Sequence, residues 1–130
     1  MAGKPVRYAF RRLAGSCVMN ECALPKQILI DSVLYDLDFT DGPIICNGID
    51  SRGSCDFNKA KILISSENAG EGRFLQILMH EVMHALLYER GLEKDCDNEV
   101  LVEQLASGIS VLMMDNPMLV DYIMRWSRER

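Results

Sequence analysis

The stretch FLQILMHEVMHALLYERG, residues 74–91, predicts a helix that presents two histidines on one side. Its apolar residues recur at steps of three and four, which is the period of an amphipathic helix, and Gly91 is a typical residue to end it. His80 and His84 are the only histidines in the chain. They are one helical turn apart and therefore project from the same face.

His80, Glu81 and His84 form the pattern H-E-x-x-H, which is typical of zinc hydrolases. Two imidazole nitrogens one turn apart can hold one Zn²⁺ at about 2.1 Å each. Glu81 lies about 100° around the helix from His80, so it stands beside the metal. There it can take a proton from a zinc-bound water and pass it to the leaving amine. The alternative, a pair of solvated polar residues, fits poorly, because so apolar a helix is expected to be buried and buried histidines need partners.

A catalytic zinc ion uses three protein ligands and keeps one position open, and the chain has no third histidine. The next predicted helix contains CDNEVLVEQLASG, residues 96–108, in which Glu99 and Glu103 share a face. One of them would bind the metal, and the other would accept an N–H from a ligating histidine. The alternative is that both are surface glutamates.

Tyr88 follows His84 by one turn and points along the same face of the predicted helix. It is a candidate catalytic residue that would donate a hydrogen bond to an oxyanion. The alternative is that its ring packs in the core.

The residues before this helix predict two β-hairpins. Residues 28–30 and 33–39 flank the turn residues Asp31-Ser32, and the second segment alternates with a period of two. A second hairpin is expected from residues 55–57 through Asn58-Lys59 to AKILIS, residues 60–65. The connections are too short for crossover helices, so the sheet should be mostly antiparallel.

Two further helices are expected after residue 91. Asp95 or Asp97 would cap a helix that runs to about Met114, and Asn116-Pro117 would begin a last helix that ends near Trp126. The predicted fold class is therefore α+β, with a small, mostly antiparallel sheet of hairpins followed by the H-E-x-x-H helix and one or two further helices.

The composition is that of a globular domain without a membrane segment. The chain has 130 residues, of which 48% are hydrophobic and 25% are charged. Its net charge of −5 argues against nucleic-acid binding through a basic field. No apolar run has the length of a membrane span or a signal peptide, so a cytoplasmic protein is expected. We expect residues 1–26 to be an N-terminal extension and residues 27–130 to form a single domain.

The cysteines are expected to be free thiols. Their number is odd, none form a C-x-x-C pair, and the expected compartment is reducing; they stand at positions 17, 22, 46, 55 and 96. Two alternatives are half of a second zinc site at Cys17 and Cys22, and a redox or metal role for Cys46, Cys55 and Cys96.

The segments HEVMHALLYERGL (80–92) and NEVLVEQLASGISVLMMDNP (98–117) together resemble a known family. The family comprises the small phage- and prophage-encoded relatives of the ImmA/IrrE group of zinc metallopeptidases, which are minimal gluzincins. ILIDSVLYDL (28–37) resembles their opening hairpin. GSCDFNKAKILIS (53–65) resembles the Cys-Asp-aromatic turn and the strand before their active-site helix. The likeness spans about residues 27–120.

The resemblance implies that His80 and His84 bind one Zn²⁺ per chain and that Glu81 is the general base and acid. It implies Glu99 as the third ligand with Glu103 behind it, whereas an alignment to the larger ImmA-like proteins would make Glu103 the ligand. It also implies that an extended substrate pairs with an edge strand, which we expect to be AKILIS.

Two functions follow as hypotheses. The first is a zinc-dependent metallo-endopeptidase of phage or prophage origin, acting in the cytoplasm of a bacterial host on a protein or peptide, by analogy a regulatory protein. The second is a non-catalytic, zinc-stabilised protein-binding module of phage or mobile-element origin. Glu81 favours the first, since a structural zinc site has no use for a base and prefers four protein ligands. Neither involves nucleic acid or a membrane, and the sequence leaves the oligomeric state open.

Overall fold

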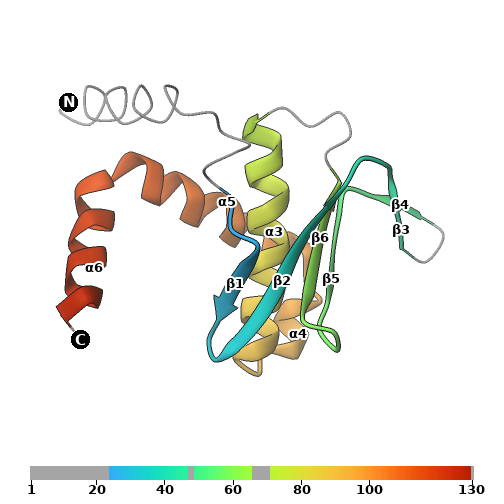
Figure 1. The fold of residues 1–130 in the computed structure, drawn as a ribbon, viewed down its shortest axis with the longest axis horizontal. Coiled ribbons are helices and arrows are strands. Elements are labelled where there is room, and N and C mark those ends of the chain that lie inside the picture. Colours follow the sequence, from blue (N-terminus) through green and yellow to red (C-terminus); the bar gives the residue numbers. More distant parts are fainter. Residues whose placement is uncertain (1–23, 47–48, 66–70, 130) are drawn as a thin grey trace. The chain divides into compact units, whose positions relative to one another are not determined.

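The structure is a computed structural model, and it describes residues 24–46, 49–65 and 71–129 (Figure 1). Most of the expected N-terminal extension, with Cys17 and Cys22, lies outside these residues. By its internal contacts the chain divides into two units. Pro25–Ser107 is one unit, and Gly108–Arg130 belongs to the other.

The first unit contains a four-stranded sheet in the order β1-β2-β6-β5. Its strands are β1 (Gln27–Ile30), β2 (Val33–Thr40), β5 (Gly53–Asp56) and β6 (Lys61–Ser65). The two predicted hairpins are confirmed, because β1 pairs with β2 and β5 pairs with β6, both antiparallel. The sheet is therefore mostly antiparallel, and the fold class is α+β as predicted.

One pairing in this sheet is parallel. Strands β2 and β6 run side by side, with Asp36 opposite Lys61 and Thr40 opposite Ser65. The chain returns between them through a separate small hairpin of β3 (Ile44–Cys46) and β4 (Ile49–Ser51) and then through β5. The return path is long enough for a parallel crossover although it contains no helix.

The expectation that AKILIS would be an edge strand is wrong. Strand β6 lies between β2 and β5 and pairs with both, so the edges of this sheet are β1 and β5. Ile62 and Ile64 are completely buried. A strand that is covered on its apolar face and paired at both edges belongs in the centre of a sheet.

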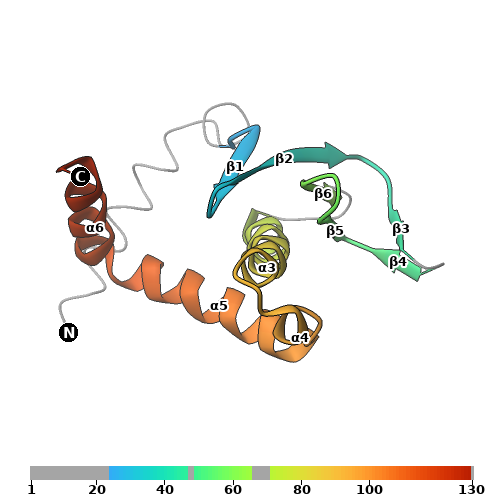
Figure 2. The same ribbon diagram turned by 90° about the horizontal axis from the view of Figure 1, so that it is seen from below.

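The core lies between the sheet and helix α3 (Glu71–Glu89), which runs along one face of the sheet (Figures 1 and 2). The predicted alternation in β2 is confirmed for Tyr35 and Leu37, which are both buried against the helix residues Leu78 and Ala85. The Tyr35 hydroxyl donates a 2.6 Å hydrogen bond to Glu89, at the end of α3. This packing fixes which face of α3 is turned away from the sheet.

Three helices follow: α4 (Glu93–Cys96), α5 (Glu99–Asp115) and α6 (Pro117–Glu129). Gly91 ends α3 with a φ of 81°, as predicted for a helix terminus. The expectation that Asp95 or Asp97 caps the next long helix is wrong. The short helix α4 intervenes, and the Asn98 side chain accepts a 3.1 Å hydrogen bond from the Leu101 amide in the first turn of α5.

The last helix begins at Pro117, as predicted, and ends at Glu129, three residues beyond the expected end at Trp126. It is strongly amphipathic, and none of its residues is buried. Within the described residues, no helix has the length and apolar character needed to cross a membrane.

Candidate metal centre

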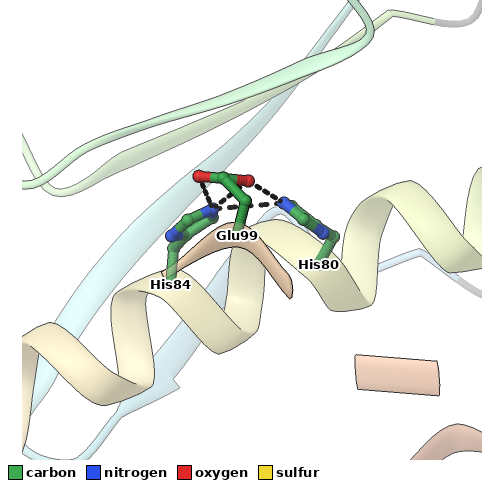
Figure 3. Close-up of side chains that lie close together, drawn as sticks. All are labelled: His80, His84 and Glu99. Carbon is green, nitrogen blue, oxygen red and sulfur yellow. Dashed lines mark hydrogen bonds and ion pairs between the residues drawn. The ribbon is translucent and has the colours of Figure 1, made fainter. Parts of the chain in front are cut away.

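Two histidines from α3 and one glutamate from α5 point toward one another (Figure 3). The Nε2 atom of His80 lies 3.0 Å from a carboxylate oxygen of Glu99, and the Nε2 atom of His84 lies 3.1 Å from the other. The two Nε2 atoms are 3.1 Å apart. Each residue thus offers one ligand atom to the same small space, and together they could hold a metal ion.

The size of this triangle fits a small ion. An ion that binds ligands tetrahedrally at about 2.1 Å holds neighbouring ligand atoms about 3.4 Å apart. With Oε1 of Glu99 as the third atom, the observed separations of 3.0–3.3 Å are within a few tenths of an ångström of that value. Small adjustments of the three side chains would close the difference.

The other nitrogen of each imidazole is held by a hydrogen bond. The Nδ1 atom of His84 donates to the backbone carbonyl of Cys96 at 2.7 Å, and Nδ1 of His80 donates to a carboxylate oxygen of Glu103 at 2.8 Å. A backbone carbonyl can only accept, so Nδ1 of His84 carries a proton, and the same tautomer of His80 lets its Nδ1 donate to Glu103. A neutral histidine in this tautomer has a bare lone pair on Nε2, as a metal ligand requires.

When both imidazoles are neutral in this tautomer, the three facing groups lack a donor. Two Nε2 lone pairs and the Glu99 carboxylate, all acceptors, are directed at one another within hydrogen-bond distance. Such acceptors repel unless a proton or a metal cation lies between them. The three groups are therefore arranged so that a proton or a metal cation could lie between them.

The surrounding charges also favour a cation. Burial alone would lower the pKa of His80, but the hydrogen bond to Glu103 and the negative charges of Glu81 and Glu99 outweigh it, and the pKa is raised. The local field therefore stabilises positive charge at this ring. A bound metal ion would supply that charge without protonating the ring.

The two glutamates, which their spacing alone could not rank, have different positions. Glu99 is the first residue of α5 and faces both Nε2 atoms. Glu103, one turn later, contacts the far side of the His80 ring. This is the arrangement in which Glu99 would bind the metal and Glu103 would orient a ligand.

Glu81 points from α3 toward strand β5. Its side chain is 8% exposed and lies against Gly53, where an added Cβ would be 2.9 Å from a Glu81 carboxylate oxygen. Burial raises the pKa of Glu81, although the neighbouring His84 and His80 act in the opposite direction. Glu81 is therefore a buried carboxylate close to the histidine pair, as a general base requires.

An open pocket of about 310 Å³ adjoins this site. His80, Glu81 and Glu103 line one part of it, and Arg52, Gly53 and Arg73 are among the residues that line the rest. The pocket thus gives solvent and small groups access to both a candidate ligand and the candidate base.

Tyr88, the other candidate catalytic residue, packs against Phe57 and not at the site. Its ring stacks on Phe57, with centroids 4.2 Å apart and planes inclined by 2°. It belongs neither to the metal-ligating group nor to the lining of the pocket. A catalytic role for Tyr88 stays a prediction, and packing accounts for its position.

Cys55 and Cys96 are both free thiols, and Cys96 contacts His84 of the candidate metal centre. Burial raises the pKa of Cys55 and of Cys96, so both are poor thiolates. The Cys96 thiol donates to the carbonyl of His84 at 3.2 Å. Of Cys46 the structure describes only the backbone, in β3.

Two features of the site were missed in the sequence. The carbonyl of Cys96, which orients His84, left no signal, because any residue type supplies a carbonyl. Gly53 did leave one, since an isolated glycine at a strand often marks a close approach of another group.

No model of a known protein family matches the chain, and comparison with curated proteins and with solved structures found no match either.

Proposed function

We propose that this protein is a zinc-dependent peptidase in which His80, His84 and Glu99 bind one Zn²⁺ and Glu81 moves the protons. The observation that carries the proposal is the convergence of three metal-ligating side chains on one small space, beside a buried carboxylate that lines a pocket. The resemblance to minimal gluzincins supports the same assignment.

The donor set favours zinc over other common ions. Two imidazoles and one carboxylate make a mixed nitrogen and oxygen set of the kind that catalytic zinc sites use, whereas Mg²⁺ and Ca²⁺ prefer oxygen ligands alone. Three protein ligands leave a fourth position open. A structural zinc site would more often have four protein ligands.

When bound, zinc would polarise the scissile carbonyl and make water acidic enough to react near neutral pH. The chain supplies the remaining functions. The Glu81 carboxylate would accept a proton from the attacking water and return it to the leaving amine nitrogen. Glu103 and the Cys96 carbonyl would hold the two imidazoles in the tautomer that leaves Nε2 free.

Strand β5 is the better candidate for binding an extended substrate. It is an edge of the sheet, and its first residue, Gly53, lines the pocket beside Glu81. A peptide laid along this strand could form main-chain hydrogen bonds while its backbone passes the candidate metal centre. We expect the substrate to be a protein or peptide, and the resemblance suggests a regulatory protein in the cytoplasm of a bacterial host of a phage or prophage.

The substitution Glu81→Gln tests the proposal. It removes the base but none of the three ligands, so the variant should retain zinc and lose at least about 100-fold in the cleavage of an unfolded protein or mixed peptides. Glu129→Gln, a matched change at an exposed carboxylate of α6, should behave as the wild type. Undiminished cleavage by zinc-loaded Glu81→Gln would refute the role of Glu81, and a zinc-loaded wild type that cleaves nothing would favour the binding-module alternative.

A further inference from the structure

The pocket beside the candidate metal centre has two arginines in its wall. Arg73 projects from the first part of α3, and Arg52 immediately precedes strand β5; both side chains are exposed and line the pocket. Gly53 packs against Ile77 and Glu81. Arg52 precedes Gly53 by one residue, and Arg73 precedes Ile77 by one helical turn. Both arginines therefore lie at the end of the pocket away from His80.

Within the described part of the chain, no ion pair occupies the two guanidinium groups. Arg90 forms an ion pair with Asp31, and Arg125 forms one with Asp121. At the end of the pocket away from His80 these two arginines, Arg52 and Arg73, form a local basic site, whereas Glu81 and Glu103 line the pocket near His80.

The helix sets the distance between this basic site and the candidate metal centre. Arg73, Ile77 and His80 follow one another at steps of four and three, so they lie on one face of α3. At a rise of 1.5 Å per residue, Arg73 stands about 10 Å along the axis from His80. An extended peptide covers that length in about three residues.

The basic site at one end of the pocket and the candidate metal centre at the other indicate one class of substrate. A guanidinium recognises a carboxylate through paired, charge-assisted hydrogen bonds, and an adjacent arginine strengthens that preference. We propose that Arg52 and Arg73 select substrates with an Asp or Glu side chain about three residues from the bond that is cleaved. The inference rests on the proposed peptidase function, but the binding preference can be measured separately from cleavage.

The binding test uses zinc-loaded Glu81→Gln protein and an array of peptides, each made in versions with Glu, Gln or Lys at every position in turn. The Glu versions should bind about tenfold more tightly than the Gln versions. This value is at the low end for hydrogen bonds to charged groups, because both arginines are exposed. In the same protein with Arg52→Glu and Arg73→Glu added, the preference should disappear or move to Lys. Arg128→Glu, a matched charge reversal on α6, should leave it unchanged. Zinc content should be equal in all variants.

The cleavage test uses wild-type protein and a mixed peptide library, with the cleaved bonds located by mass spectrometry. Acidic residues should be enriched two to four positions from the cleaved bond, on one side only. Cleavage or binding that is indifferent to Glu, Gln and Lys, or no peptide binding at all, would overturn the inference. Acid-selective binding without any cleavage would instead uphold the basic site and remove the peptidase function.

Discussion

The Nε2 atoms of His80 and His84 lie 3.1 Å apart, although each ring already donates its Nδ1 proton to another acceptor. The carboxylate of Glu99 faces the same space, so a proton or a metal cation between these groups would relieve their mutual repulsion. The hydrogen bonds of His80 and His84 therefore favour a positive charge between the two rings.

Zinc should stabilise the folded protein, because the ligands come from two helices that are brought together only by folding. Free zinc at about 100 times its dissociation constant should raise the free energy of unfolding by about 2.7 kcal/mol. Thermal unfolding with zinc and with a chelator measures this difference. In His84→Ala the two curves should coincide, and an equally large shift in that variant would place the zinc elsewhere.

Replacing Gly53 with alanine should disable Glu81 without removing the metal. The new Cβ would lie 2.9 Å from both a Glu81 oxygen and an Ile77 methyl group, so the flexible carboxylate must move. We expect zinc content to be unchanged, peptidase activity to fall at least tenfold, and stability to fall by about 1–3 kcal/mol from overpacking.

Gly42→Ala is the matched control, because an added Cβ at that residue meets nothing within 4 Å. Both variants can be compared by zinc content, unfolding and cleavage of the same peptide. Full activity in Gly53→Ala would show that Glu81 tolerates displacement or does not act in the reaction.

The sequence predicted the parts of this fold that local geometry determines. A helix of 3.6 residues per turn forces His80 and His84 onto one face, and the period of two in β2 places Tyr35 inward. The sequence did not predict which strands pair when they are far apart in the chain. Nothing in AKILIS distinguishes a central from an edge strand, since the neighbour that completes the pairing, β2, is distant in the sequence.

The same limit applies to the candidate site. The spacing of Glu99 and Glu103 made both eligible as ligands, and only the position at which α5 begins decides which one faces the two Nε2 atoms. That position depends on the short helix α4 and on the Asn98 cap. The packing of Glu81 against Gly53 likewise depends on how the sheet meets α3.

The buried Tyr35 should make the protein sensitive to alkali. Burial and the hydrogen bond to Glu89 raise the pKa of Tyr35 above its ordinary value of about 10. The neutral Tyr35 side chain therefore contributes its full stabilisation below pH 10, and this stabilisation is lost as the pH rises above that value. Urea unfolding at pH 8 should show that the free energy of unfolding of Tyr35→Phe is about 1–3 kcal/mol lower than that of the wild type. The reason is that the Glu89 carboxylate has lost its hydrogen-bond donor in this variant.

Between pH 8 and pH 11 the stability of Tyr35→Phe should fall less than that of the wild type, since no phenol at this position can ionise. Tyr122→Phe, at an exposed tyrosine of α6, is the matched control and should keep the wild-type slope. A parallel decline in wild type and Tyr35→Phe would mean that other groups govern alkaline unfolding.

The most direct test of the metal centre is elemental analysis of untagged protein purified without chelators, for the wild type, Glu99→Ala and Glu103→Ala. The geometry predicts about one zinc per chain in the wild type and almost none in Glu99→Ala. In Glu103→Ala the metal should be retained with an affinity about 10–100-fold lower, because that residue only orients His80. A wild-type protein that holds no zinc and takes up none when it is supplied would contradict the account.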